Sequence, residues 1–150
     1  MARNPARRRS GCPISHGLDI FGDKWTLLIL RDLLLKGKSR FREFLGSEES
    51  IASNILSERL SRLERSGLAT KGPDPNDRRR TVYRPTQAGA ELLPVLVELA
   101  YWGAIHDPAT LAPRAFALAY RKNRAALIAK LRSAIQIDRA GGRRSSSQDS

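Results

Sequence analysis

The spacing of apolar residues predicts helices in the first third of the chain. Between residues 14 and 21 a short apolar pattern is compatible with a helix. After Asp23 a stronger pattern follows, in which apolar residues recur at the three- and four-residue intervals of one helix face, and Gly37 ends it. Ser39 then lies at the position expected for an N-cap, and a short helix is predicted over residues 40–45. We therefore expect this part of the chain to be helical.

A longer amphipathic helix is predicted from Ser50 onward, with Gly67 as its terminating residue. Its apolar residues recur so that they cluster on one side of a helix. The opposite face is polar and begins with small side chains: Ser53, Asn54, Ser57, Ser61, Glu64 and Arg65. We expect this helix to bury one face and to present the other to solvent.

A β-hairpin is predicted directly after this helix. Two short β-prone runs, at residues 68–72 and 80–86, flank a turn made of proline, aspartate and asparagine. Five bases stand on the hairpin against two acids: Lys71, Arg78, Arg79, Arg80 and Arg84 against Asp74 and Asp77. The hairpin is therefore expected to project positive charge.

The last part of the pattern predicts two long helices. Thr86 caps one that runs to about His106, with Pro94 kinking it near its start. Pro113 suits the first position of a last helix that reaches about Ile137. A small domain has limited surface to cover two such apolar stripes, so we expect a partner chain to share them.

Length and charge set the organisation of the chain. With 150 residues and 41% apolar content it can bury one core. The formal net charge of +12 suggests a polyanionic partner, yet residues 11–109 carry fourteen bases against thirteen acids, so the excess lies at the ends. Residues 1–12 and 139–150 lack apolar periodicity and are predicted to be disordered tails, the first of them basic. We expect the folded domain at 13–108 and a C-terminal dimerisation helix within 109–138.

The sequence offers little for catalysis or metal binding. It has two histidines and one cysteine, no Gly-rich phosphate loop, and no His/Cys/Asp cluster with metal-ligand spacing. We therefore expect neither an enzyme nor a bound metal or cofactor. No apolar run reaches the length of a signal peptide or a membrane span, and one cysteine cannot form an internal disulfide. A soluble cytoplasmic protein without membrane contact is expected.

The order of the predicted elements is that of a winged helix-turn-helix, so the expected fold class is mainly α with a small β-hairpin (α+β). The polar-faced helix is slim enough to enter a major groove, where small side chains approach base edges. Arginines on a projecting hairpin hold phosphates or enter a minor groove. This layout predicts binding to double-stranded DNA. Because a fold does not dictate its ligand, a winged-helix module for protein–protein or RNA contact is the alternative.

Several stretches of this sequence resemble HxlR-type regulators. They are CPISHGLDIFGDKWTLLILRDLL, FREF, SNILSERLSRLERSGL and RTVYRPTQAGAELLPVLVELAYWG, which follow one another without a large gap over roughly residues 11–108. The resemblance implies a bacterial DNA-binding transcriptional regulator that works as a homodimer, joined mainly through its N-terminal and long C-terminal helices. The helix from about Pro113 onward and the basic tails depart from the resemblance, which gives weaker guidance there.

The resemblance also implies which residues contact DNA. Its base-reading face would consist of Ser53, Asn54, Ser57 and Glu58, with Arg59 near the DNA backbone, and its wing contribution of Arg78, Arg79 and Arg80. Asn54 is the sharpest candidate, because an asparagine amide can pair with adenine through two hydrogen bonds. Two such helices in a dimer would enter successive major grooves about 34 Å apart on a pseudo-palindromic operator. Repression is the outcome we expect, because no activating domain is evident.

Cys12 is a candidate redox sensor, because some members of the resembled family use the equivalent cysteine in this way. A thiol near a helix start and beside the basic residues Arg7, Arg8 and Arg9 is expected to react readily. Without a second cysteine, oxidation would give an intermolecular disulfide, a mixed disulfide or a sulfenic acid. The sequence leaves open, and does not identify, a small-molecule effector.

Overall fold

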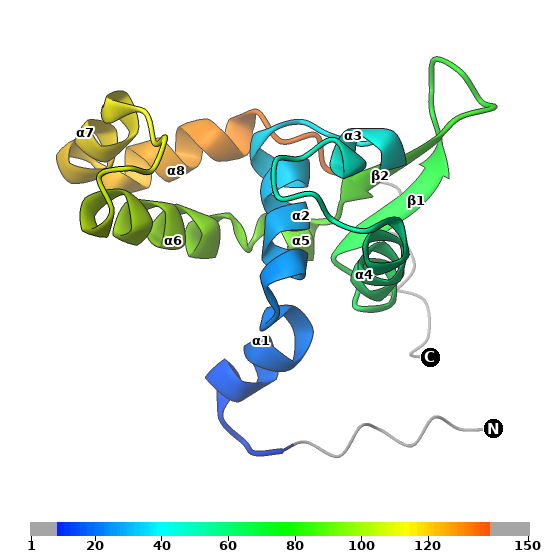
Figure 1. Ribbon diagram of the computed structural model, residues 1–150, viewed down its shortest axis with the longest axis horizontal. Coiled ribbons are helices and arrows are strands. Elements are labelled where there is room, and N and C mark those ends of the chain that lie inside the picture. The colour runs from blue at the N-terminus through cyan, green and yellow to red at the C-terminus, as the bar shows by residue number, and fades with distance from the viewer. Residues whose placement is uncertain (1–8, 139–150) are drawn as a thin grey trace, which may run out of the picture.

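The computed structural model describes residues 9–138 (Figure 1). The helices are α1 (Pro13–Phe21), α2 (Lys24–Leu35), α3 (Phe41–Leu45), α4 (Ser53–Arg65), α5 (Gln87–Ala90), α6 (Leu93–His106), α7 (Arg114–Lys122) and α8 (Arg124–Ser133). The strands β1 (Ala69–Pro73) and β2 (Thr81–Pro85) form an antiparallel hairpin. These elements confirm the expected fold class. The predicted tail at 139–150 and most of the one at 1–12 lie outside the described residues.

The core lies where α2, α4 and α6 meet the hairpin. Its fully enclosed leucines come from all three helices: Leu30, Leu56, Leu60 and Leu93. Burial of one such side chain contributes about 1.5–3 kcal/mol, so the apolar stripes read from the sequence hold these elements together. Phe44 of α3 adds a ring that meets the ring of Tyr83 edge-on, with centroids 6.3 Å apart. The core therefore joins the short helix, the polar-faced helix and the hairpin into one unit.

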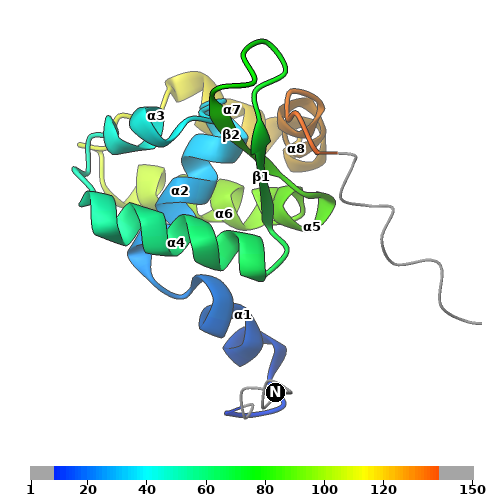
Figure 2. The same cartoon turned by 90° about the vertical axis from the view of Figure 1, so that its right-hand side faces the viewer.

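The hairpin stands beside α4, and its loop projects away from the helices (Figure 2). Lys71 of β1 is in register with Tyr83 of β2, and the connecting loop comprises residues 74–80. The backbone N–H of Tyr83 donates to the carbonyl oxygen of Ser39 at 2.7 Å. This bond attaches the segment before α3 to the hairpin.

The start of α3 differs from the expectation that Ser39 is its N-cap. The N-cap is Arg40, because Glu43 occupies the third helical position and accepts from the N–H of Arg40 at 2.9 Å. Satisfying this orphan donor fixes the helix start one residue later than predicted. The carbonyl of Ser39 is then available to the hairpin.

The helix predicted from Thr86 to His106 is divided into α5 and α6 directly before Pro94, where the kink was predicted. Thr86 does cap the first, α5, by accepting from the N–H of Gly89 at 3.1 Å. The helix is interrupted by a turn at residues 91–92, and Pro94 lies in the first turn of α6. Pro94 has no N–H to donate to the carbonyl of Ala90 and its ring crowds that carbonyl, so the hydrogen-bond pattern is interrupted after α5 and restarts in α6.

The single helix predicted from Pro113 to about Ile137 was wrong. The chain leaves the helical conformation at Asn123, where α7 ends and α8 begins. The side chain of Asn123 accepts from the N–H of Ala126 at 3.0 Å, so it serves as the N-cap of α8. The two helices fold back against α6, and Figure 1 shows the three together on one side of the molecule.

Candidate nucleic-acid interface

The helix α4 presents a polar face to solvent because its apolar face is held in the core. Leu56, Leu60 and Leu63 are buried against α2, α3 and the hairpin. The side opposite them carries exposed small polar residues near the start of the helix: Ser53, Asn54 and Ser57. Figure 2 shows α4 running across the front of the molecule, with the hairpin loop above it. A long ligand can therefore reach both elements from one side.

Asp23 connects α4 to the start of α2. It is the N-cap of α2, accepting from the N–H groups of Trp25 and Thr26 at 3.0 Å each, and its Oδ1 also accepts from Nε of Arg59 at 3.0 Å. Partial burial raises the pKa of Asp23, but hydrogen bonds from Thr26 and Arg59 outweigh this and lower it to about 2. The carboxylate is therefore charged at neutral pH, and it orients α4 against α2.

Two residues predicted to contact DNA take part in this connection. Arg59 points back to Asp23 and also bonds to Glu58, and its side chain is only 21% exposed. Glu58 in turn bonds to Arg62 at 3.2 Å, and these arginines hold the pKa of its carboxyl group below the usual range. The structure thus separates an exposed group, Ser53, Asn54 and Ser57, from a paired group further along α4.

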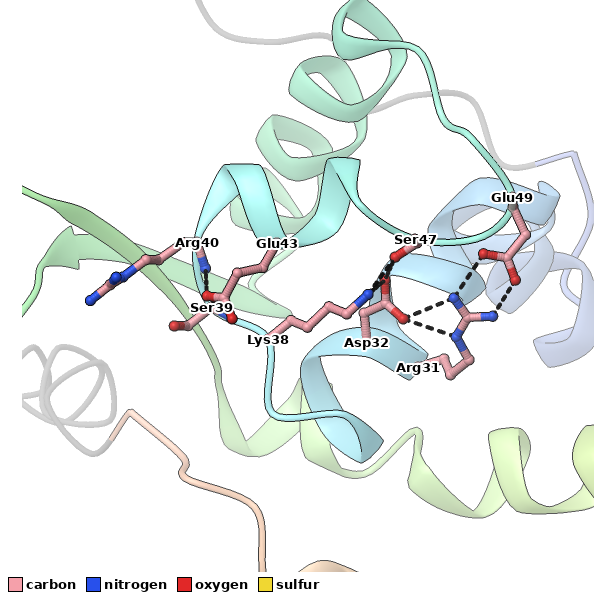
Figure 3. Close-up of polar contacts among 8 residues, drawn as sticks. All are labelled: Arg31, Asp32, Lys38, Ser39, Arg40, Glu43, Ser47 and Glu49. Atoms are coloured by element: carbon pink, nitrogen blue, oxygen red, sulfur yellow. Dashed lines mark hydrogen bonds and ion pairs between the residues drawn. The ribbon is translucent and has the colours of Figure 1, made fainter. Parts of the chain in front are cut away.

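A second polar network fixes the segment between α3 and α4 (Figure 3). Asp32 of α2, 2% exposed, accepts from Arg31 at 3.0 Å and from the hydroxyl of Ser47. Lys38 donates to Ser47 at 2.7 Å. Arg31 also forms a two-point contact with Glu49, which lowers the pKa of that carboxyl group to about 2. Since Ser47 and Glu49 lie just before α4, the network places the start of that helix.

The loop of the hairpin is organised by Asp74. Its N–H donates to the carbonyl of Arg80 at 2.8 Å, and its carboxylate accepts from the N–H of Asn76 and from the guanidinium of Arg40 at 2.9 and 2.8 Å. The Asn76 and Arg40 contacts hold the pKa of Asp74 below its ordinary value. Because Arg40 begins α3, this ion pair ties the hairpin to the helix that precedes α4.

The predicted wing arginines are all exposed: Arg78, Arg79 and Arg80. The side chain of Arg79 is 92% exposed, and Nε of Arg79 and of Arg80 each lie 3.4 Å from Asp77. Such contacts between exposed groups are weak, so these guanidinium groups are available to another anion. The hairpin therefore presents positive charge next to α4, as its sequence indicated.

The sequence analysis did not predict the residues that position α4 and the hairpin. Asp23 had a recognisable signal, an aspartate at the start of an apolar helical run, which favours an N-cap. The pairs Arg31–Glu49 and Arg40–Asp74 join residues 18 and 34 positions apart, and no local pattern indicates them.

Cys12 is exposed at the N-cap of α1. Within residues 9–138 no group of three His, Cys, Asp or Glu side chains is placed to hold a metal ion.

Comparison with known proteins finds similar chains among transcriptional regulators. A family model described as HxlR-like helix-turn-helix matches residues 20–110. The Mycobacterium bovis protein Mb3122, named as an HTH-type transcriptional regulator, is 36% identical over 103 residues, which cover 69% of this chain and 64% of the relative. Bacillus subtilis YdeP, named likewise, is 34% identical over 93 residues, which cover 62% of this chain and 72% of YdeP. The chain thus matches less than two thirds of the length of the mycobacterial relative.

Solved structures that resemble this chain are also described as a transcription factor or a regulator. The crystal structure of PA1607 superposes with a TM-score of 0.60 at 36% identity, covering 71% of each chain. The redox regulator HypR in its oxidized form superposes with a TM-score of 0.53 at 30% identity, covering 62% of this chain and 95% of HypR. The fold is therefore shared with proteins that carry regulator names.

Proposed function

This chain belongs to the HxlR-like helix-turn-helix family, and we propose that it is a DNA-binding transcriptional regulator that acts as a homodimer and represses transcription. The observation that carries the proposal is the exposed polar face of α4 beside an arginine-tipped hairpin. A major groove accepts an α-helix, and the neighbouring hairpin then meets the phosphate backbone or the adjacent minor groove. No catalytic role is part of the proposal.

In this proposal α4 reads the bases. Asn54 is exposed in the first turn of the helix, so its amide is free to approach an adenine edge, with Ser53 and Ser57 beside it. Glu58 and Arg59 border this face. Arg59 pairs with both Glu58 and Asp23, and these contacts keep α4 in the orientation that contact with the bases requires. The wing arginines add sequence-independent affinity through phosphate contacts.

The homodimer is proposed from apolar surface that residues 9–138 leave exposed. On α1 the side chains of Ile14 and Leu18 are 72% and 52% exposed, and on α6 those of Leu99 and Trp102 are 52% and 63% exposed. Each pair is spaced to lie on one helix face. A second copy of this chain that covers both faces would remove this surface from water and place two copies of α4 on a pseudo-palindromic operator.

A membrane span is the second interpretation of the apolar surface of α6. The segment Gln87–His106 is long and apolar enough, by composition alone, to cross a membrane. The backbone, however, interrupts it between α5 and α6, and Glu98 within it bonds to Tyr120 at 2.7 Å and to Arg124. A charged network on an interrupted helix is costly in lipid. We therefore propose a cytoplasmic protein whose α6 contacts another protomer.

Cys12 carries a second proposal, that oxidation of this thiol changes DNA binding. The thiol is exposed at the N-cap of α1, the helix that we place at the dimer interface. The similarity to HypR, which is named a redox regulator, favours this role. A disulfide with Cys12 of a second copy, formed with loss of two electrons and two protons to a peroxide oxidant, would lock or distort that interface.

The proposed function is tested by selecting duplexes from a random library with the full chain and measuring binding by fluorescence anisotropy. Asn54→Ala should relax the choice of base at one position, at a cost of about 1–3 kcal/mol. Arg79→Ala should weaken binding to all duplexes and reduce the salt slope by about 1. Arg114→Ala, an exposed arginine on α7, is the matched control and should change neither.

Two results would contradict the proposal. Unchanged base preference in Asn54→Ala would show that α4 does not present its polar face to the bases. Equal affinity for an RNA hairpin of the selected sequence, or no selection of any duplex, would favour the module for RNA or protein contact.

A further inference from the structure

A cavity of about 370 Å³ lies between α2, β2 and the segment that follows α8. It is bounded by the end of α2, by residues 83–85 of β2 and by residues 134–136, which follow α8. Its volume falls in the range of roughly 300–1,000 Å³ typical of small-molecule sites. The wall at 134–136 lies outside the range of 20–110 that the family model matches. The cavity is therefore completed by a part of this chain that lies beyond the family match.

The lining combines polar groups, apolar side chains and positive charge. Leu34, Leu35 and Ile135 provide apolar surface, and no aspartate or glutamate is among the lining residues. Of its two bases, Lys38 is already compensated, because its amino group lies 2.7 Å from Ser47 and 3.4 Å from Asp32. The remaining cation therefore decides which ligand fits.

Arg84 is that cation. Its Nη1 donates to Oε1 of Gln136 at 3.1 Å, so its hydrogen-bond partner within residues 9–138 is a neutral amide, and its charge acts on Asp74, whose pKa it helps to lower, without a hydrogen bond to that carboxylate. A guanidinium presents a planar fork of donors that matches a carboxylate through two parallel hydrogen bonds. Hydrogen bonds to a charged acceptor are roughly twice as strong as those to a neutral one, so a carboxylate would displace the Gln136 amide.

We propose that this cavity binds a small organic carboxylate with an apolar body. The carboxylate pairs with Arg84 in place of Gln136, and the apolar body packs between Leu34 and Ile135. The charge and the shape of the site thus select one class of ligand: a monocarboxylic acid of about the size of an aromatic or short aliphatic acid.

The position of the cavity makes this ligand an effector of DNA binding. Residues 134–138 are held on the hairpin by the N–H of Asp138, which donates to the carbonyl of Pro85 at 2.9 Å, and by the hydroxyl of Thr70, which donates to Asp138 at 2.6 Å. Across the cavity, Tyr83 of β2 is bonded to Ser39 before α3. A ligand that replaces Gln136 changes how this segment holds β2, and with it the position of the wing relative to α4. This regulatory role rests on the proposed function, whereas the binding site does not.

The test measures binding of benzoate and hexanoate to the full chain by calorimetry and by NMR, with benzamide as the uncharged match for benzoate. Arg84→Gln removes the guanidinium, and Arg132→Gln, an exposed arginine of α8 outside this lining, is the control. Ile135→Trp fills the cavity and leaves Arg84 in place. Circular dichroism of each variant establishes that it folds, so lost binding can be assigned to the site.

We expect at least one of the two acids to bind with a Kd of about 1 mM or tighter. Binding should weaken about ten-fold or more for benzamide, for Arg84→Gln and for Ile135→Trp, and stay unchanged for Arg132→Gln. At saturation the acid should change the affinity for a selected duplex about five-fold or more. Absence of binding, equal binding of benzoate and benzamide, or unchanged binding by folded Arg84→Gln overturns the site. If no duplex is bound at all, the proposed function fails, while the carboxylate titration still decides the site.

Discussion

Replacing Asp23 tests how α4 is positioned. The carboxylate caps α2 through the N–H groups of Trp25 and Thr26 and receives Nε of Arg59 from α4, all at 3.0 Å. Asparagine can still cap a helix but carries no charge, whereas alanine provides neither. The variants Asp23→Asn and Asp23→Ala therefore separate the cap from the ion pair.

The pKa of Asp23 sets the size of the expected loss. Burial raises this pKa, and hydrogen bonds from Thr26 and Arg59 outweigh it and lower it from 3.8 to about 2. That lowering corresponds to about 2 kcal/mol. We reduce this to about 1 kcal/mol, because the side chain is 27% exposed and solvent screens the pair. At pH 7 Asp23→Asn should thus lower the free energy of unfolding by about 1 kcal/mol, and Asp23→Ala by about 2, since losing a cap costs about 1.

The loss should depend on pH in one direction. Because the pKa in the folded state lies below the unfolded value of 3.8, the carboxylate contributes its full stabilisation well above that value. The contribution is lost as the pH falls from about 5 toward 2. The difference in stability between the wild type and Asp23→Asn should therefore shrink between pH 5 and pH 3.

Urea denaturation followed by tryptophan fluorescence, at one fixed protein concentration, measures these differences. Asp19→Asn is the matched control: it removes an exposed carboxylate whose partner is the exposed Arg9, so it should cost little. Equal losses in Asp23→Asn and Asp23→Ala, or a loss in Asp23→Asn that stays constant between pH 5 and pH 3, would refute the reasoning. Weaker duplex binding by Asp23→Asn with unchanged base preference should accompany the loss.

Three further predictions follow from close contacts and exposed surface. Gly89→Ala should lower the free energy of unfolding by about 1–3 kcal/mol, because a Cβ there would lie 2.0 Å from the carbonyl oxygen of Leu68, whereas Gly103→Ala, with open space around it, should be neutral or stabilising in the same melts. Trp102→Glu should raise the dissociation constant of the dimer about 30-fold or more in sedimentation velocity, and an unchanged dimer would place the interface elsewhere. Peroxide should give a disulfide-linked dimer on non-reducing gels for the wild type and none for Cys12→Ser; oxidation without any change in duplex binding would exclude the sensor.

The periodic parts of the chain were the parts that the sequence predicted well. The apolar stripe that ends at Gly67 predicted α4 correctly, because a helix with apolar residues on one side buries that side in the core. The turn residues between the two β-prone runs gave the hairpin, because proline and aspartate there favour a reversal of the chain. The exposure of Asn54 followed from the same periodicity. Pro94 marked the interruption at residues 91–92, whereas the break at Asn123 carries no glycine or proline, so the last helix was not predicted as two.

The local elements, the polar face of α4 and the charge of the wing follow from the order of the residues, because helical and strand periods, caps and turns act over a few residues. How these elements are held depends on packing: Asp23 pairs with Arg59, Arg40 pairs with Asp74, and the C-terminal segment lies against β2 and closes a cavity at Arg84. Those contacts join residues tens of positions apart. They exist only once the shared core has packed the helices, so no local pattern could encode them.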